Sequence, residues 1–591
     1  MLLMKKTKIV STLGPASNSV DTITKLIESG ANVFRFNFSH GDHEEHLDRM
    51  NKVRQAVEQT GIDVGILLDT KGAEIRTTAQ ATETGKIPFE IGDAVRIAMD
   101  PELEGTKEKI SVTYEGLFDD VHEGGHVLFD DGLIDMLILE KDEKNRELVT
   151  EVQNPGILGS RKGVNAPGVS ISLPGITDKD ADDIRFGLQH DINYIAASFV
   201  RKAQDVLDIR EILEETGMTH VQIFPKIESQ EGIDNIDEIL KVSDGIMVAR
   251  GDMGVEIPAE LVPMAQKDII KKCNAAGKSV ITATQMLESM QENPRPTRAE
   301  ASDVANAVFD GTDATMLSGE SANGSYPVEA VSTMARIDVE AEKSMLRLGS
   351  YQINQFDKTD VTETIGLSVA RAAKNLGVKC IVAATESGHT AKMISKYRPD
   401  ADILAVTFDE QTKRGLMLNW GVYPTVTEKP ETTDDMFELA TKKTLELGFA
   451  KEGDLILITA GVPVGERGTT NVMKIQMIGS KLIEAQGVGA HPVVANTVVA
   501  KTAEEAIAKA KDGMVLVVPS TDKEYMPAIE KAAALVVEES GLTSHAAVVG
   551  VAQDLPVVVG AKDALNIIND GELVTVDPRR GIVYRGETMA I

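Results

Sequence analysis

The sequence predicts an α/β protein, and three observations lead to this fold class. Short apolar runs rich in β-branched residues recur along the first 320 residues, and stretches with helical periodicity separate them. The runs are apolar throughout, as expected for parallel strands that are buried on both faces. Eight runs occur, beginning at Lys8, Asn32, Val64, Asn193, Val221, Gly245, Ser279 and Ala314. Eight βα units in succession indicate a (β/α)8 TIM barrel.

One interval between the predicted strands is far longer than a single helix requires. Residues 71–167 follow the third run and carry short strand-like segments broken by Gly, Asp and Asn. We therefore expect an inserted β-barrel domain, with the catalytic barrel itself formed by residues 1–70 and 168–345. The insertion leaves from the carboxyl-terminal face of the barrel, where it could act as a lid.

Two further domains are expected after the barrel. An α/β pattern begins near Thr362, which predicts an α/β domain over residues 346–474. A fourth unit is expected over residues 487–591. The length of 591 residues is consistent with about four domains.

The composition excludes several classes of function. The net charge of −31, from 61 basic and 92 acidic residues, argues against nucleic acid or an anionic membrane as a partner. The two cysteines, Cys273 and Cys380, form no C-x-x-C pair and imply no disulfide framework. The amino-terminal residues contain no apolar signal segment, and no apolar stretch is long enough to span a bilayer. We expect a cytoplasmic protein.

Polar and charged residues follow most of the predicted strands. The ends of the eight strands meet at one face of a barrel, so these side chains should converge there. They are Arg35, Asn37, Ser39, His40, Asp69, Thr70, Lys71, Ser198, Lys226, Glu228, Arg250, Asp252, Thr284, Gln285, Ser318 and Glu320. Any one of them could be an ordinary loop residue, but six or more converging ends indicate an active site.

The fifth and sixth strand ends predict the chemistry of this site. Glu228 and Asp252 would lie on neighbouring strands without a His or Cys cluster, which favours Mg²⁺ or Mn²⁺. Lys226 would point to the same side as Glu228. An ammonium beside a divalent cation stabilises a transferring phosphoryl group or an enolate oxygen. Gly251 would let a ligand approach the backbone, whose amides could bind a carboxylate or phosphate.

A second group of oxygen-bearing residues ends the second and third strands. It consists of Asn37, Ser39, Asp69 and Thr70, and its one formal negative charge suits a monovalent cation better than a divalent one. On the pattern alone, ordinary loop polarity is the alternative. The nearby His43 and His46 are interpreted as solvated imidazoles at the start of a helix.

Several longer motifs extend this interpretation. They are "TKIVSTLGPAS", "FNFSHGDHEEH", "LLDTKGAEIRT", "GSRKGVNAPG", "FPKIES", "VARGDMGVEIP", "TATQMLESM", "PRPTRAEASDVANAVFDGTDATMLSGESANG" and "YRPDADILAVT". They occur in this order, and the match that they carry runs from about residue 6 to residue 474. Together they resemble the pyruvate kinase family, in particular its bacterial form with an extra carboxyl-terminal domain. The resemblance implies phosphoryl transfer from phosphoenolpyruvate to ADP, giving pyruvate and ATP in the last step of glycolysis, by a homotetramer.

The resemblance also implies a role for individual residues. Arg35 would contact the substrate phosphate, and Lys226 would stabilise the phosphoryl group in transfer. Glu228 and Asp252 would bind Mg²⁺, while Thr284 and the backbone of Gly251 and Asp252 would bind the substrate carboxylate. For protonation of the enolate, a water relayed through Thr284 is favoured over the Thr284 hydroxyl, and Lys226 is a weaker candidate.

Cation and nucleotide contacts follow from the same resemblance. Asn37, Ser39, Asp69 and Thr70 match a K⁺ site, and His40, Arg76 and Lys162 match nucleotide contacts. Glu74 occupies the position where K⁺-dependent members carry glutamate and K⁺-independent members carry lysine, so we expect K⁺ dependence. Arg250 is expected to brace the site without a direct part in catalysis.

A second candidate site lies in the predicted α/β domain. Its hydroxyl- and glycine-rich loop leads into a helix and consists of Thr385, Ser387, Gly388, His389 and Thr390. This pattern fits a phosphate cradle or a plain strand-to-helix turn. The resemblance implies an allosteric effector here, a sugar monophosphate or AMP rather than fructose 1,6-bisphosphate, over which "GVPVGERGTTN" from Gly461 could close.

The carboxyl-terminal unit contains a further motif. The segment "GLTSHAAVVGVAQDLPVVVG" from Gly541 resembles the swivelling phosphohistidine domain of phosphoenolpyruvate-utilising enzymes, with His545 at the position of the phosphorylated histidine. The resemblance implies a swivelling-type β/α domain over residues 487–591. A role in stability, assembly or regulation is favoured over phosphorylation. Two rival functions stay open, namely a Mg²⁺-dependent aldolase or lyase and a sugar-phosphate sensor without activity.

Overall fold

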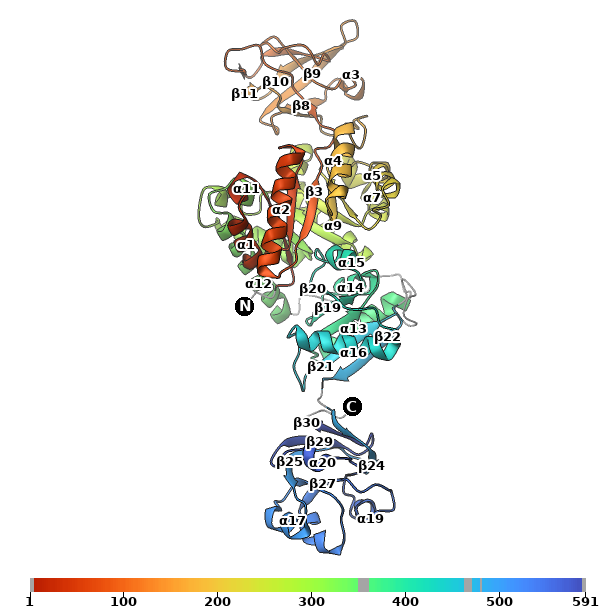
Figure 1. Cartoon of the computed structure of the whole chain (residues 1–591). Coiled ribbons are helices and arrows are strands. Elements are labelled where there is room, and N and C mark those ends of the chain that lie inside the picture. The colour runs from red at the N-terminus through yellow and green to blue at the C-terminus, as the bar shows by residue number, and fades with distance from the viewer. Residues whose placement is uncertain (1–4, 349–360, 462–469, 479–480, 587–591) are drawn as a thin grey trace. The chain divides into compact units, whose positions relative to one another are not determined.

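The computed structural model describes residues 5–348, 361–461, 470–478 and 481–586 (Figure 1). The chain divides into two compact units. The first comprises residues 1–370, 385–429 and 465–470, and the second comprises residues 371–384, 430–464 and 471–591. In the described part of the chain, no helix is both long enough and apolar enough to cross a membrane. Cys273 and Cys380 are both buried, and neither forms a disulfide.

The barrel predicted from the sequence is confirmed. Eight parallel strands close in the order β1-β17-β16-β15-β14-β13-β3-β2. They are β1 (Lys8–Thr12), β2 (Val33–Asn37), β3 (Gly65–Asp69), β13 (Tyr194–Ala197), β14 (Gln222–Ile227), β15 (Gly245–Ala249), β16 (Ser279–Ala283) and β17 (Ala314–Leu317). Each begins within one residue of its predicted run.

Helices cover the outside of these strands. They include α1 (Val20–Ser29), α2 (His43–Thr60), α4 (Asp178–Gln189), α5 (Ala203–Glu215), α7 (Ile236–Val242), α9 (Val262–Ala276), α10 (Arg298–Asp310) and α12 (Pro327–Leu348). Local sequence sets their ends: α1 begins where the Ser19 side chain accepts the amide of Thr22, and it stops at Gly30, whose φ of 116° favours glycine.

Alternate strand residues face two separate apolar layers. Val10, Leu67 and Phe224 belong to the core inside the barrel, whereas Ile9 and Phe34 belong to the core between strands and helices. Both faces of each strand are therefore buried, which explains why the predicted runs are apolar throughout. The side chains that fill the barrel make it a packed core, and function is confined to its ends.

The inserted region after β3 contains the predicted β-structure and one short helix, α3 (Leu117–Asp120). It forms a seven-stranded sheet of order β4-β12-β8-β9-β10-β6-β7 and a separate two-stranded sheet of β11 and β5, rather than a single closed sheet. The strands are β4 (Ile75–Arg76), β5 (Lys86–Phe89), β6 (Ala94–Ala98), β7 (Lys109–Ser111), β8 (His126–Phe129), β9 (Ile134–Asp142), β10 (Glu147–Val152), β11 (Gly156–Gly159) and β12 (Gly163–Asn165). The entering strand β4 pairs with the leaving strand β12.

A five-stranded sheet of order β20-β19-β18-β21-β22 follows the barrel. Its elements are α13 (Val361–Leu376), β18 (Cys380–Ala384), α14 (His389–Ser395), β19 (Asp402–Thr407), α15 (Glu410–Gly415), β20 (Val422–Val426), α16 (Thr433–Glu446), β21 (Leu455–Ala460) and β22 (Val472–Met477). Met417 and Leu418, just after α15, pack with the residues that fill the inside of the barrel.

The carboxyl-terminal region contains an eight-stranded sheet of order β23-β30-β29-β25-β26-β27-β28-β24. Val515 and Leu516, successive residues of β26, belong to two different apolar cores, so both faces of the sheet centre are buried. The elements are β23 (Lys481–Glu484), β24 (Gln486–Val488), β25 (Val493–Val499), α17 (Ala503–Lys509), β26 (Met514–Val518), α18 (Met526–Ile529), β27 (Ala532–Val537), α19 (His545–Gln553), β28 (Val557–Val559), α20 (Ala564–Ile567), β29 (Leu573–Asp577) and β30 (Ile582–Arg585).

Candidate functional site

Charged side chains from three strands meet at the carboxyl-terminal face of the barrel. Arg35, on β2, places its Nε 2.5 Å from Asp69 Oδ2 at the end of β3. Lys226, on β14, places its Nζ 3.4 Å from Asp69 Oδ1 and 3.0 Å from Glu228 Oε1. The charged side chains at the ends of these three strands therefore meet in one buried network.

Burial and charge set opposite protonation tendencies in this network. Burial alone lowers the pKa of Lys226, but the charges of Asp69 and Glu228 outweigh it, and the pKa lies above the usual value. Burial raises the pKa of Asp69, but Arg35 and Lys226 bring it below the ordinary range. For Glu228 burial prevails over Lys226 and raises the pKa to about 8. Lys226 therefore stays protonated and positively charged. The charge of Lys226 is not enough to offset the effect of burial on the pKa of Glu228.

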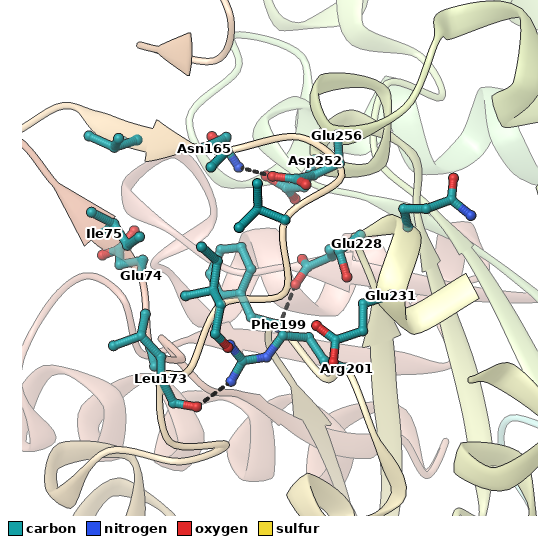
Figure 2. Close-up of a pocket in the computed structure, with 18 of the residues that line it drawn as sticks. Glu74, Ile75, Asn165, Leu173, Phe199, Arg201, Glu228, Glu231, Asp252 and Glu256 are labelled. Atoms are coloured by element: carbon teal, nitrogen blue, oxygen red, sulfur yellow. Dashed lines mark hydrogen bonds between the residues drawn. The ribbon is translucent and has the colours of Figure 1, made fainter. Parts of the chain in front are cut away.

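A cavity of about 570 Å³ opens beside these residues, between the barrel and the inserted domain (Figure 2). Glu228 and Asp252 line it from the barrel, and Glu74, Arg76 and Lys162 line it from the inserted domain. The cavity brings together the residues expected to bind the divalent cation and two of those expected to contact the nucleotide.

The donor set at this cavity fits a hard divalent cation. Glu228 Oε2 accepts the backbone amide of Phe199 at 2.6 Å, while the buried Oε1 forms an ion pair with Lys226 Nζ at 3.0 Å. Asp252 supplies a second carboxylate at the same cavity. No group of three His, Cys, Asp or Glu residues that could hold a metal exists in the part of the chain that the structure describes. The remaining ligands would be water and substrate oxygens, as is usual for Mg²⁺.

The segment after β15 has a defined backbone geometry. The helix α8 (Arg250–Glu256) begins at once, and the Gly251 amide donates to Thr284 Oγ1 at 2.7 Å. Thr284 has a φ of 66°, an uncommon conformation for a branched residue. Arg250 lies 2.7 Å from Asp303 Oδ2 and donates to the Thr284 carbonyl at 2.8 Å, so its side chain braces this turn.

The expected K⁺ ligands come from adjacent strands. Asn37 and Asp69 are register partners on β2 and β3. Asn37 Oδ1 accepts the amide of Ser39 at 3.1 Å, and Thr70 Oγ1 accepts the amide of Ser198 at 3.1 Å. The geometry places these oxygen-bearing residues on neighbouring segments, with Asp69 and Thr70 buried and Ser39 exposed.

The residues expected at the nucleotide are paired with acids, except for one. Arg76 donates from Nε and Nη2 to Glu74 at 2.7 and 2.8 Å, and Lys71 Nζ lies 3.2 Å from the same carboxylate. Lys162 Nζ lies 2.9 Å from Asp130 Oδ1. His40 is exposed and is not among the residues that line the cavity.

The interpretation of His46 as a solvated imidazole was wrong. His46 is 2% exposed, stacks on Phe38 at 3.9 Å between ring centroids, and places Nε2 2.9 Å from the His40 carbonyl. Burial lowers its pKa to about 4. The helical face that carries His46 turns inward, whereas His43 stays partly exposed and pairs with Asp183 at 2.8 Å.

Two tertiary contacts near the cavity were not predicted from the sequence. Asn165 Nδ2 of the inserted domain donates to Glu256 Oε1 of the barrel at 2.7 Å, and Arg201 donates at 2.6 Å to the carbonyl of Leu173, in the segment that follows the inserted domain (Figure 2). Asn165 and Glu256 both lie in motifs that carry the family resemblance. Their pairing across 91 positions has no local signal in the sequence.

The predicted effector loop is a turn between β18 and α14. Gly388, at the amino-terminal end of α14, has a φ of 80°, and Ser387 is exposed. Thr385 is buried, and Thr390 Oγ1 lies 2.8 Å from Thr470 Oγ1. The expected closing segment includes residues 462–469, which lie outside the described residues.

Comparison with known proteins agrees with this architecture. Residues 4–331 match the family model of the pyruvate kinase barrel domain, and residues 363–476 match that of its alpha/beta domain. Residues 510–581 match the mobile domain of PEP-utilising enzymes, which confirms the resemblance found around His545. In the structure, His545 Nδ1 lies 3.0 Å from Thr521 Oγ1.

Full-length relatives extend the match over the whole chain. The chain is 63% identical to a pyruvate kinase of Lactobacillus delbrueckii subsp. bulgaricus over 99% of both chains. It is 55% identical to one of Bacillus licheniformis over 100% of both chains. A solved structure of a Cryptosporidium parvum pyruvate kinase superimposes with a TM-score of 0.75 at 40% identity, covering 80% of this chain and 96% of that one.

Fold, site and relatives together define a phosphotransferase built on a (β/α)8 barrel. More specifically, the chain belongs to the pyruvate kinase family.

Proposed function

We propose that this protein transfers the phosphoryl group of phosphoenolpyruvate to ADP, giving pyruvate and ATP, in the last step of glycolysis. The observation that carries the proposal is the buried ammonium of Lys226, 3.0 Å from a carboxylate that lines the cavity. Phosphoryl transfer depends on positioning and charge neutralisation more than on covalent chemistry by the protein. The network around Lys226 is suited to that task.

In the proposed mechanism each charged residue has a distinct task. Lys226 and Arg35 neutralise negative charge on the phosphoryl group, and the pairing of Arg35 with Asp69 holds its guanidinium in place. Glu228 and Asp252 would hold Mg²⁺ or Mn²⁺, which supplies Lewis-acid stabilisation of the reacting oxygens. The backbone of Gly251 and Asp252, together with Thr284, would orient the substrate carboxylate.

Delivery of the proton to the enolate carbon involves Thr284 in this proposal. Its hydroxyl donates to the Ala283 carbonyl at 2.7 Å and accepts from Gly251, so it is engaged on both sides. This supports a water relayed through Thr284 over direct donation by the hydroxyl. Lys226 is the weaker candidate, because its raised pKa holds the proton.

Further assignments belong to the same proposal. Asn37, Ser39, Asp69 and Thr70 would bind K⁺, and Glu74 predicts that activity depends on it. His40, Arg76 and Lys162 would contact the nucleotide, and the loop Thr385, Ser387, Gly388, His389 and Thr390 would bind a sugar monophosphate or AMP as allosteric effector. A cytoplasmic homotetramer with domains at 1–70 plus 168–345, 71–167, 346–474 and 487–591 completes the proposal.

The decisive experiment measures ATP formed from phosphoenolpyruvate and ADP with Mg²⁺ and K⁺ present. We expect ATP and pyruvate in equal amounts. A Mg²⁺-dependent aldolase or lyase, or an inactive sugar-phosphate sensor, would form no ATP, and that result would reject the proposal. Titrating phosphoenolpyruvate against a panel of sugar phosphates and AMP would identify the effector.

A further inference from the structure

We propose that Ser198 is a positioning residue that links the Lys226 ammonium to the monovalent-cation cluster at Asp69 and Thr70. The inference rests on the proposed function and adds a residue to which that function assigns no role. Ser198 follows β13, which lies between β14 and β3 in the barrel. Its place in the strand order therefore puts it between the lysine and the cluster.

Ser198 contacts both neighbours through one buried hydroxyl. The residue is 4% exposed, and its Oγ donates to the Thr70 carbonyl at 2.6 Å. The same Oγ accepts from Lys226 Nζ at 2.9 Å. A hydroxyl has one proton to donate and two lone pairs, so both bonds form together.

The backbone of Ser198 strengthens the link to Thr70. Its amide donates to Thr70 Oγ1 at 3.1 Å, so the side chain and the backbone of Ser198 each engage Thr70. Asp69 Oδ1 lies 3.3 Å from Ser198 Oγ and 3.4 Å from Lys226 Nζ. If cation binding displaces Thr70, the Ser198 side chain should move with it and change the position of the Lys226 ammonium.

The hydroxyl also fixes the direction of the ammonium. Lys226 has three N–H groups, and its oxygen neighbours are Glu228, Ser198 and Asp69. Without the hydroxyl, two carboxylates alone would hold the ammonium, and its position would depend on whether Glu228 also binds a metal. Ser198 is neutral, so it orients Lys226 without adding charge to the site.

The test compares Ser198→Ala with Ser243→Ala, which removes a matched bond at the other end of the barrel. Ser243 is 3% exposed, and its Oγ donates to the Ile239 carbonyl at 2.6 Å, with no contact to the proposed site. Hydrogen bonds to charged groups are strong enough that kcat should fall about 10- to 100-fold in Ser198→Ala. KM for phosphoenolpyruvate should change less, and the K⁺ concentration for half-maximal activity should rise.

A second readout does not depend on activity. Binding of K⁺ to the folded protein raises its melting temperature, relative to a large organic cation at equal ionic strength. We expect this increase to shrink in Ser198→Ala and to persist in Ser243→Ala. Ser198→Cys keeps a side chain of similar shape that hydrogen-bonds only weakly, and it replaces Ser198→Ala if the alanine variant fails to fold. Its increase in melting temperature with K⁺ should be smaller than that of the unaltered protein.

Two results would overturn the inference. One is a Ser198 variant with unaltered kcat and unaltered response to K⁺, and the other is an equal loss in Ser243→Ala. Failure of the proposed function is a separate result, because it would appear as absence of ATP formation in the unaltered protein. The melting-temperature comparison would still decide the role of Ser198 in that case.

Discussion

The two ends of the barrel both bury charged side chains, yet they use them differently. At the carboxyl-terminal end, Lys226 and Glu228 lie beside a cavity of about 570 Å³ that Glu228 lines. At the amino-terminal end, Asp313 Oδ1 accepts from Arg398 Nη1 at 2.8 Å and from the Trp420 amide at 3.2 Å, while Oδ2 accepts the Val280 amide at 3.0 Å. Backbone and arginine donors thus occupy both oxygens of Asp313, whereas Glu228 pairs with Lys226 and lines the cavity.

The lysines at the two ends show the same difference. Burial lowers the pKa of Lys8 to about 7, and its Nζ donates to the Val422 carbonyl at 2.6 Å and lies 4.6 Å from the Tyr423 ring centroid. For Lys226, by contrast, carboxylates reverse the effect of burial and raise the pKa. Burial of a charge is therefore no sign of a catalytic site by itself. A fixed charge paired with a carboxylate that lines a cavity is a better sign.

The largest expected effect comes from replacing the lysines. Lys226→Met should lower kcat for ATP formation by about 10³-fold, because a preorganised charge at the phosphoryl group is lost. Lys8→Met should keep activity close to that of the unaltered protein. Circular dichroism checks that both variants are folded. Equal losses of activity in the two variants would remove the distinction between the ends of the barrel.

The next effect separates metal binding from stability. Glu228→Gln should raise the Mg²⁺ concentration for half-maximal activity by about 10- to 100-fold, because one carboxylate ligand is lost. Asp313→Asn breaks the buried pair with Arg398 and should lower the free energy of unfolding by about 3 kcal/mol. Urea titration and Mg²⁺ titration measure the two quantities. The comparison fails if Asp313→Asn shifts the Mg²⁺ requirement as much as Glu228→Gln does.

A smaller effect tests the cation at the carboxyl-terminal end. Glu74→Lys introduces an ammonium at the position where K⁺-independent members of the family carry lysine, and it should bring the ratio of activity with K⁺ to activity with a large organic cation towards one. Glu74→Gln removes the charge that pairs with Arg76 and Lys71 without supplying a cation, so it should keep the K⁺ requirement. If unaltered protein works equally well without K⁺, the role assigned to Glu74 is incorrect.

The last effect concerns stability alone and leaves activity unchanged. His46 has a folded pKa of about 4, below the ordinary 6.5, so the unfolded chain binds more protons between these values. The free energy of unfolding should therefore decrease as pH falls from 6.5 to 4, by at most about 3 kcal/mol from this residue. In His46→Gln the decrease should be smaller by that amount, measured by urea unfolding at several pH values. An unchanged pH dependence would show that His46 is accessible to protons in the folded state.

Much of the architecture was predictable from local patterns. Strand runs such as those at Lys8 and Gly245 are apolar throughout because both faces are buried, and their number indicated the barrel. The residues at the ends of the strands then indicated the site, because all parallel strands of a barrel end at one face. Long motifs indicated the family, which the relatives confirm.

Pairings between distant segments were decided only by the tertiary structure. The bond of Asn165 to Glu256, the burial of His46 against Phe38, and the place of Ser198 between Lys226 and Thr70 all depend on which segments meet in space. A sequence shows which side chains can donate or accept, and periodicity shows which face of an element they occupy. The partner that satisfies them, and hence the pKa of Lys226, Glu228 or Lys8, depends on packing between elements far apart in the chain.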